Sequence, residues 1–233
     1  MKIALLGYGR MGKAIEKIAI DRGHVIVAKI DKDTGLEGLE TADVAINFSI
    51  PDAAVGNISE ALNRSVPVVC GTTGWLEKLE DIKQLCVEKN SAFLYASNFS
   101  LGVNLFFELN KKLAKLMHTQ PHYKAMIDEI HHTQKLDAPS GTAITLAEGL
   151  IENSTYNNWK LDAEEDNQLK ITAQRIDDVP GTHTVYYKSE VDTIEIKHTA
   201  HNRTGFALGA VVAAEWIVGK QGVFGMNDVL NIG

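Results

Sequence analysis

The sequence predicts an α/β fold in two parts: a parallel sheet covered by helices, and a second α+β domain with a mixed, mostly antiparallel sheet. In the first hundred residues, short β-branched runs alternate with amphipathic segments, as in parallel sheets covered by helices. After Asn98 the pattern changes to helix-like segments and strand-like runs, and an alanine-rich helical segment follows. We expect that last segment to pack on the first domain. The expected domains are residues 1–100 with 206–233, and residues 101–205.

The first domain contains five expected strands and three expected helices. Apolar residues from Met11 to Ala19 have helical spacing, and Gly23 ends that helix. Pro51 suits the first turn of a second helix, and a third is expected at 75–90. Glycines break residues 31–42, so any helix there should be short. The expected strands are 2–6, 25–30, 44–48, 66–70 and 92–96.

The second domain is expected to begin with a helix. The alanine-rich helix comes after this domain in the chain. Hinges are expected near Ser100 and near residues 203–205. The expected helices are 103–117, 140–151 and 206–220, and the expected strands are 122–130, 169–176, 182–188 and 193–199.

Composition excludes several classes of protein. The 233 residues are 45% hydrophobic and 23% charged, with no apolar run near the ~20 residues that a membrane span needs. The start of the chain lacks a signal-like core, so we expect a cytoplasmic protein. Cys70 and Cys86 have no metal-ligand spacing and are interpreted as buried thiols. A net charge of −7 disfavours nucleic-acid binding, so an anionic ligand needs a local positive pocket.

A glycine motif predicts a Rossmann-like nucleotide site. Gly7, Gly9 and Gly12 form GYGRMG between the first strand and the first helix, where they allow a tight turn and close approach of a pyrophosphate. The helix amino terminus favours the phosphate charge. Asp31 ends the second expected strand, where a carboxylate can bind ribose hydroxyls. The alternative is a glycine turn without a ligand.

Two further features concern the same cofactor. Lys32 could meet the 2′-phosphate of NADP, although it could equally be a solvated surface lysine. The GTTG run at 71–74 follows the fourth expected strand and would flank the nicotinamide half, unless it is an ordinary turn.

The densest polar cluster is EIHHTQKLDAPSGTA, from Glu129 to Ala143. It follows an expected strand and ends at a helix start, so two histidines, a lysine and free amides share one loop. Paired histidines alone are more often structural. Together with their neighbours they predict proton donors beside an anion cradle.

This run resembles the active-site signature of the dihydrodipicolinate reductases, also called 4-hydroxy-tetrahydrodipicolinate reductases, E-x-H-H-x-x-K-x-D-A-P-S-G-T-A. The resemblance extends to GYGRMG, INFS at 46–49, GTTG, ASNFSLGVN at 96–104 and FGMNDVL near the end. It implies NAD(P)H-dependent reduction of a small dicarboxylate, 4-hydroxy-tetrahydrodipicolinate, to tetrahydrodipicolinate in diaminopimelate and lysine biosynthesis, by a homotetramer. The chain is shorter than is usual in that family, which leaves the choice between NADH and NADPH open.

The resemblance also implies roles for individual residues. His131 is expected to be the general acid, and Lys135 a carboxylate holder and second proton donor. The expected substrate contacts are His132, Lys135, Ser140, Gly141 and Thr142. The expected cofactor contacts are Gly7, Tyr8, Gly9, Arg10, Met11, Gly12, Asp31, Lys32, Gly71, Thr72, Thr73, Ala96, Ser97, Asn98 and Phe99.

Other interpretations explain less of the sequence. His198 and His201 lack an evident third metal ligand, so we expect no metal site, and His201 has no assigned role. An amino-acid or diaminopimelate dehydrogenase does not account for the HHxxKxDAPSGT run. A redox sensor that binds NADH without turnover should carry a basic partner-binding region, and the acidic chain shows none.

Overall fold

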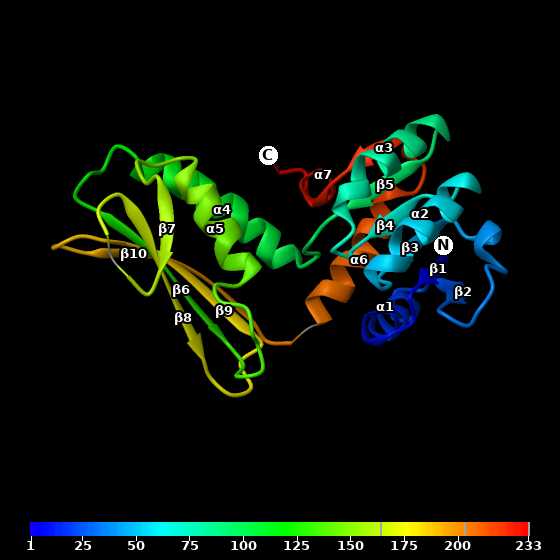
Figure 1. The fold of residues 1–233 in the computed structure, drawn as a ribbon, viewed down its shortest axis with the longest axis horizontal. Helices are drawn as coiled ribbons and strands as arrows, with labels where there is room; N and C mark the ends of the chain where they lie inside the picture. Colours follow the sequence, from blue (N-terminus) through cyan, green and yellow to red (C-terminus); the bar gives the residue numbers. More distant parts are fainter. Residues whose placement is uncertain (164, 203, 233) are drawn as a thin grey trace. The chain divides into compact units, whose positions relative to one another are not determined.

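A computed structural model describes residues 1–163, 165–202 and 204–232. The chain divides into two compact units (Figure 1): unit 1 is Met1–Leu101 with Thr204–Gly233, and unit 2 is Gly102–Arg203. These bounds lie within two residues of the expected domain limits. The expected hinge at 203–205 includes Arg203, which lies outside the described residues.

Unit 1 contains a six-stranded sheet in the order β11-β5-β4-β3-β1-β2, and all its strand pairs are parallel. Because β1 lies between β2 and β3, the strand order reverses there. Ligands of such sheets bind beyond the carboxyl ends of the strands at this reversal. The strands are β1 (Lys2–Leu6), β2 (Val25–Ile30), β3 (Val44–Asn47), β4 (Val68–Cys70), β5 (Ala92–Tyr95) and β11 (Gly222–Phe224).

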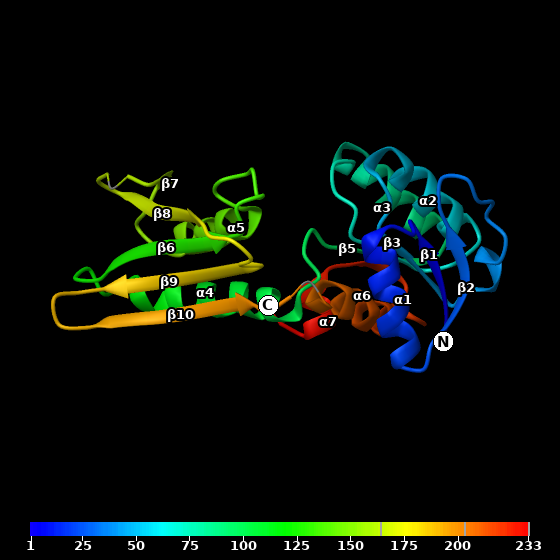
Figure 2. The same cartoon turned by 90° about the horizontal axis from the view of Figure 1, so that it is seen from below.

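Helices cover both faces of this sheet, which confirms the Rossmann-like prediction (Figures 1 and 2). One core joins the sheet to α1 (Arg10–Asp21), α6 (Thr204–Ile217) and α7 (Met226–Leu230). The other joins it to α2 (Pro51–Asn63) and α3 (Leu79–Glu88). The alanine-rich helix therefore packs on the first unit, as expected.

Several boundaries differ from the prediction. The helix expected at 75–90 is a 3₁₀ turn, η2 (Leu76–Lys78), followed by α3, and the glycine-broken stretch holds only η1 (Leu39–Thr41). The helix expected at 206–220 ends at Ile217. Strand β11 and helix α7 were missed because three and five residues are too short to show a period.

Unit 2 contains a five-stranded sheet in the order β10-β9-β6-β8-β7. It is mixed, as predicted: two of its four strand pairs are antiparallel and two are parallel, and the antiparallel pairs are the longer ones. The parallel pairing of β6 with β8 follows from α5 (Gly141–Ile151), which lies between them in the chain, because a helical crossover returns the chain parallel. The strands are β6 (Lys124–His131), β7 (Asn158–Leu161), β8 (Gln168–Arg175), β9 (Gly181–Lys188) and β10 (Thr193–Ala200), of which β7 was not predicted.

Both helices of unit 2 pack on one face of this sheet. Side chains from α4 (Leu101–Met117) and α5 meet Ile127 and Val185 in a single core. On the other face, Met126 and Tyr186 are only partly buried. No described helix of this unit packs there.

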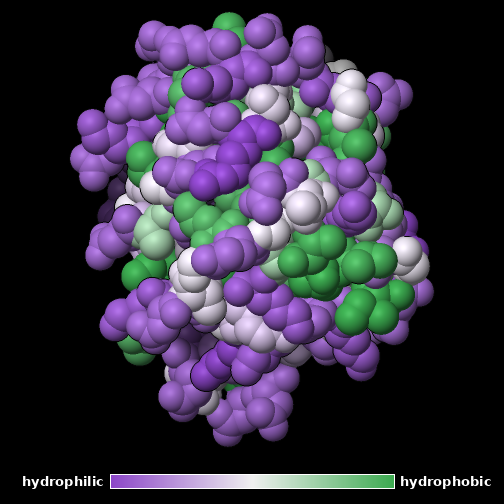
Figure 3. Space-filling model, turned by 90° about the vertical axis from the view of Figure 1, so that its right-hand side faces the viewer, coloured by the Kyte–Doolittle hydropathy of each residue, from purple (hydrophilic) through white to green (hydrophobic). Residues whose placement is uncertain are grey.

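The surface is mostly polar, as expected when amphipathic helices and strands bury their apolar sides. The face shown in Figure 3 is mostly hydrophilic, with hydrophobic side chains in small groups. Among the described helices, none is long and apolar enough to cross a bilayer.

We expect Gly209→Ala to destabilise unit 1. A Cβ at Gly209 would lie 1.6 Å from the carbonyl oxygen of Phe99, so α6 or the segment after β5 must move. Overpacking of this kind costs about 1–3 kcal/mol or more. Thermal unfolding would measure it. Gly56→Ala in α2 is the control, because its Cβ would meet no atom within 4 Å and alanine favours a helix. Equal melting of both variants would contradict the prediction.

Candidate active site

The predicted cofactor residues lie along one edge of the unit 1 sheet. They follow the carboxyl ends of β1, β2, β4 and β5. Together with β3, these strands form a continuous row in the sheet, and β11 is the edge strand next to β5. In parallel strands these ends share one edge, so separate motifs meet there.

The three glycines of the first motif have different tasks. Gly7 has a φ of 95°, and a Cβ there would lie 2.5 Å from the carbonyl oxygen of Phe48. A Cβ at Gly12 would lie 2.4 Å from the carbonyl oxygen of Gly7. Gly9, the residue before α1, is exposed, and its Cβ would meet no atom within 4 Å. Two glycines therefore allow tight packing, and the third leaves open space at a helix amino terminus, which suits a phosphate.

The other side chains of the glycine motif differ in how available they are to a ligand. The Tyr8 hydroxyl donates to Glu16 and accepts a hydrogen bond from Lys29 at 3.3 Å. Arg10 is exposed, whereas Met11 packs against the core. Arg10 is therefore the side chain of this loop that is most available to a ligand.

Asp31 and Lys32 form an exposed turn after β2. The Asp31 amide donates to Thr34 Oγ1 at 2.7 Å, and the Lys32 amide donates to Asp31 Oδ1 at 2.9 Å. The second of these bonds orients the Asp31 carboxylate, and the Lys32 side chain is exposed.

In the run after β4, Thr72 is buried and Thr73 is exposed. Thr72 Oγ1 donates to the Ser49 carbonyl at 3.1 Å and accepts from the buried Asn47 amide at 3.3 Å. A Cβ at Gly71 would lie 2.3 Å from the Phe48 ring. Thr72 and Gly71 thus hold two loops together, and Thr73 is free to face a ligand.

Phe99 differs from the other predicted cofactor contacts. Its side chain is 2% exposed, and its ring centroid lies 5.6 Å from that of Phe48 within the core. Asn98 Oδ1 accepts the Ser100 amide at 2.9 Å. Phe99 can therefore reach a ligand only through its backbone.

In unit 2, the predicted catalytic and substrate-binding residues lie at the end of β6, at the start of α5 and on the connection between them. His131 ends β6, and Ser140 caps α5 by accepting the Ala143 amide at 3.2 Å. Gly141 is exposed, and its Cβ would meet no atom within 4 Å. The amino terminus of α5 is therefore open to an anion.

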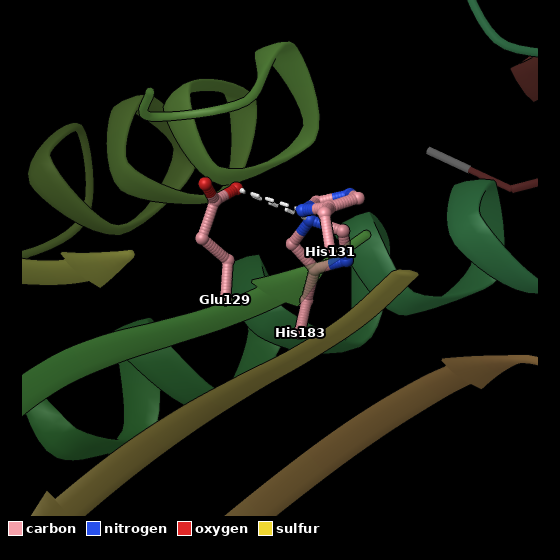
Figure 4. A group of neighbouring side chains, drawn as sticks. All are labelled: Glu129, His131 and His183. Carbon is pink, nitrogen blue, oxygen red and sulfur yellow. Dashed lines mark ion pairs between the residues drawn. The ribbon is translucent and has the colours of Figure 1, made fainter. Parts of the chain in front are cut away.

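The fully buried carboxylate of Glu129 organises this connection (Figure 4). Its Oε1 accepts two N–H groups of Arg175 at 3.2 Å each, and its Oε2 accepts the Ser140 amide at 3.0 Å. Oε2 also lies 3.6 Å from His131 Nδ1 and 3.7 Å from His183 Nε2. Figure 4 shows the three side chains converging from β6 and β9.

Glu129 and His131, the two ionisable groups of β6 in this cluster, both have lowered pKa values. Burial raises the pKa of Glu129, but His183 and the Ser140 hydrogen bonds outweigh burial, and the pKa falls to about 2. Burial lowers the pKa of His131 to about 4, helped by the charges of His183, Lys135 and Arg175 and opposed by Glu129. At neutral pH the unliganded site therefore pairs a charged carboxylate with a neutral His131.

Lys135 and His132 occupy the loop itself. Lys135 Nζ lies 2.8 Å from both carboxylate oxygens of Asp137, an exposed pairing that lowers the pKa of Asp137. His132 is half-buried. Arg175 donates to the carbonyls of Lys135 at 3.2 Å and Asp137 at 2.6 Å, which ties the loop to the sheet.

A metal is a poor fit for the buried cluster. The donor atoms of Glu129, His131 and His183 lie within 4.8 Å of one another, a spacing that could hold an ion. However, Ser140 already bonds Glu129 and, through its hydroxyl at 3.1 Å, His183, while Arg175 supplies the positive charge. We therefore interpret the cluster as an ion-pair network.

The other histidine pair gives no metal signal either. His198 is half-buried, with its ring 6.0 Å from that of Phe106, and burial lowers its pKa. His201 is exposed.

No role was predicted for Glu129, His183 or Arg175. One signal was available: Glu129 and His131 are two residues apart on a strand, so they share a face. His183 and Arg175 come from strands paired with β6, and a single sequence does not reveal that pairing.

Unit 2 also contains a cavity of about 1090 Å³. It lies beside Lys124 and Met126, at the opposite end of β6 from His131, and none of the predicted site residues line it. It has no evident part in the chemistry of the β6–α5 connection.

Comparisons with known proteins agree on one family. Residues 1–99 match "Dihydrodipicolinate reductase, N-terminus", and residues 102–230 match "Dihydrodipicolinate reductase, C-terminus". A 4-hydroxy-tetrahydrodipicolinate reductase from Christiangramia forsetii is 55% identical over 99% of this chain and 98% of its own. One from Methanoregula boonei is 35% identical over 99% and 98%.

Solved structures agree on the fold. A dipicolinate-bound dihydrodipicolinate reductase from a Paenisporosarcina species has a TM-score of 0.80 at 22% identity, covering 98% of each chain. An amine dehydrogenase from Mycobacterium smegmatis has a TM-score of 0.60 at 10% identity, covering 96% of this chain and 94% of its own, a likeness of fold alone. From the two family matches and these relatives, the chain belongs to the dihydrodipicolinate reductase family.

Proposed function

We propose that the protein reduces 4-hydroxy-tetrahydrodipicolinate to tetrahydrodipicolinate with NADH or NADPH, in diaminopimelate and lysine biosynthesis. The observation that carries the proposal is the β6–α5 connection, which holds His131, a lysine and an open helix amino terminus. Those groups suit a dianionic substrate that must gain a proton.

Unit 1 provides the cofactor half of the proposal. When bound, the nicotinamide supplies the hydride. The open space at Gly9 and the start of α1 suit the pyrophosphate, and the oriented Asp31 carboxylate suits the ribose hydroxyls. Lys32 stands where it could meet a 2′-phosphate, which supports use of both cofactors.

Unit 2 provides the substrate half. The amides at the start of α5 and the ammonium of Lys135 are suited to the two carboxylates. The exposed Lys135–Asp137 pair is worth no more than about 1 kcal/mol, so a substrate carboxylate can replace Asp137 at little cost.

The chemistry requires one proton in addition to the hydride. After the 4-hydroxyl group leaves as water, hydride addition at ring carbon 4 of the conjugated imine leaves an electron-rich enamine. His131 donates a proton to it and is later reprotonated from solvent.

We also infer a homotetramer. The face of the unit 2 sheet that carries Met126 and Tyr186 is not covered by any described helix, and it offers a broad partly apolar surface.

The proposal is tested by following the absorbance of NADH and NADPH with freshly made condensation product of pyruvate and aspartate semialdehyde. The expected result is oxidation of either cofactor. His131→Gln should lower kcat by roughly 10²- to 10⁴-fold with little change in cofactor affinity, because a positioned general acid contributes that much. Oxidation of an amino acid with NAD(P)⁺, and no reaction with the condensation product, would instead support a dehydrogenase.

Lys135→Ala should weaken binding of pyridine-2,6-dicarboxylate by roughly 10- to 100-fold, because a charge-assisted hydrogen bond is worth about 1.5–3 kcal/mol. Calorimetry measures the affinity, and NADH affinity should stay constant. Asp137→Ala is the matched variant: it frees Lys135, so binding should hold or tighten. If Lys135→Ala binds the analogue as tightly as the parent, the carboxylates are held elsewhere.

Lys32→Ala should weaken NADPH binding and leave NADH binding unchanged, because only NADPH presents the 2′-phosphate. The measurement is KM for each cofactor. Lys17→Ala, another exposed lysine of unit 1, serves as the control. An equal loss for both cofactors would indicate a general defect rather than recognition of the phosphate.

A further inference from the structure

One buried ion pair holds both the loop and the helix of the proposed substrate site. Glu129 accepts the Ser140 amide that begins α5, and it binds Arg175 through its other oxygen. Arg175 in turn donates to the carbonyls of Lys135 and Asp137. Loss of this side chain would therefore release the helix start and the lysine loop together.

The same carboxylate faces the proposed general acid. His131 Nδ1 is buried and, within the described part of the chain, has no hydrogen-bond partner. It lies 3.6 Å from Glu129 Oε2. A charge-assisted bond is about 2.8 Å long, so a protonated His131 needs a movement of only about 0.8 Å to donate to Glu129.

We propose that Glu129 is a positioning residue that acts through His131: it is the counter-ion of the protonated imidazole and also fixes the start of α5. The proposal rests on the proposed function, in which His131 gives a proton to the substrate.

Among the charged groups around His131, Glu129 is the one that stabilises its protonated form. His183 on β9, Arg175 on β8 and Lys135 on the loop all disfavour a proton on His131, and burial disfavours it most. Glu129 is the group that favours it. A bound dicarboxylate would add negative charge and raise the pKa of His131 again, so the proton is expected to arrive with the substrate.

Glu129→Gln tests the proposal, because it keeps the shape and removes the charge. A general acid works only when protonated, so kcat falls as pH rises through the pKa of His131 in the substrate complex. Without the Glu129 charge that pKa is lower, and the fall should occur about one to three pH units further to the acid side. The measurement is kcat between pH 5 and 9, with the rate recovering toward that of the parent at low pH.

Asp128→Asn is the matched control. Asp128 is the neighbouring residue on β6 and faces the opposite side of the sheet, so its pH profile should match that of the parent. Glu129→Asp keeps the charge, so kcat should fall at the same pH as in the parent, although kcat itself should be lower. A Glu129→Gln enzyme that is slower by the same factor at every pH would overturn the proposal, since a purely structural residue behaves in that way.

A second measurement serves if Glu129→Gln does not fold. In the parent protein with ¹³C-labelled histidine, NMR titration should show that the pKa of His131 rises when pyridine-2,6-dicarboxylate binds. An unchanged pKa would overturn the proposal. This result does not depend on turnover, whereas failure of the proposed function would appear as no cofactor oxidation by the parent enzyme.

Discussion

The ion pair between Glu129 and Arg175 is the constraint on which the rest of the substrate site depends. A carboxylate with no exposed surface must be fully hydrogen-bonded, because an unpaired buried charge costs several kcal/mol. The protein meets that requirement with a guanidinium from β8 and the amide of Ser140, the residue that caps α5. The partners of Glu129 are therefore not interchangeable: satisfying the charge also fixes where the helix begins and where the loop runs. Stability and site geometry have the same cause here.

The cofactor edge of unit 1 is organised by sterics instead of charge. Gly7, Gly12 and Gly71 each stand where a Cβ would come within 2.5 Å of another group, so the loops after β1, β3 and β4 pack directly on one another. Gly9 alone of the glycine motif faces open space. The close packing supports the edge, and the gap at Gly9 leaves backbone amides available at the start of α1.

The sequence predicted unit 1 well because its signals are local. Strand runs, a helical period and Pro51 identify elements without knowledge of their neighbours, and the glycine motif is read within six residues. The site in unit 2 was half predictable for the same reason: His131, Lys135 and Ser140 lie within ten residues of one another in the chain. Arg175 and His183 are 46 and 54 residues from Glu129, and β-sheet pairing alone brings them together. A mixed sheet was predicted, but which strands pair in parallel, as β6 and β8 do, was not, because a crossover is a property of topology that the residue pattern does not specify.

The charge balance of the site explains why a proton is central to it. Arg175 is cancelled by Glu129, and Lys135 by Asp137, so the unliganded site has little net positive charge despite its two cations. In a chain of net charge −7, a dianionic ligand gains nothing from the overall field. Positive charge must then come from the helix amides, from a lysine that exchanges its partner, or from an added proton. The least committed acceptor of such a proton is His131, whose Nδ1 is buried, unpartnered within the described chain and 3.6 Å from a carboxylate that is already fixed in place. The proton that balances the substrate charge would then be the one that the reaction consumes.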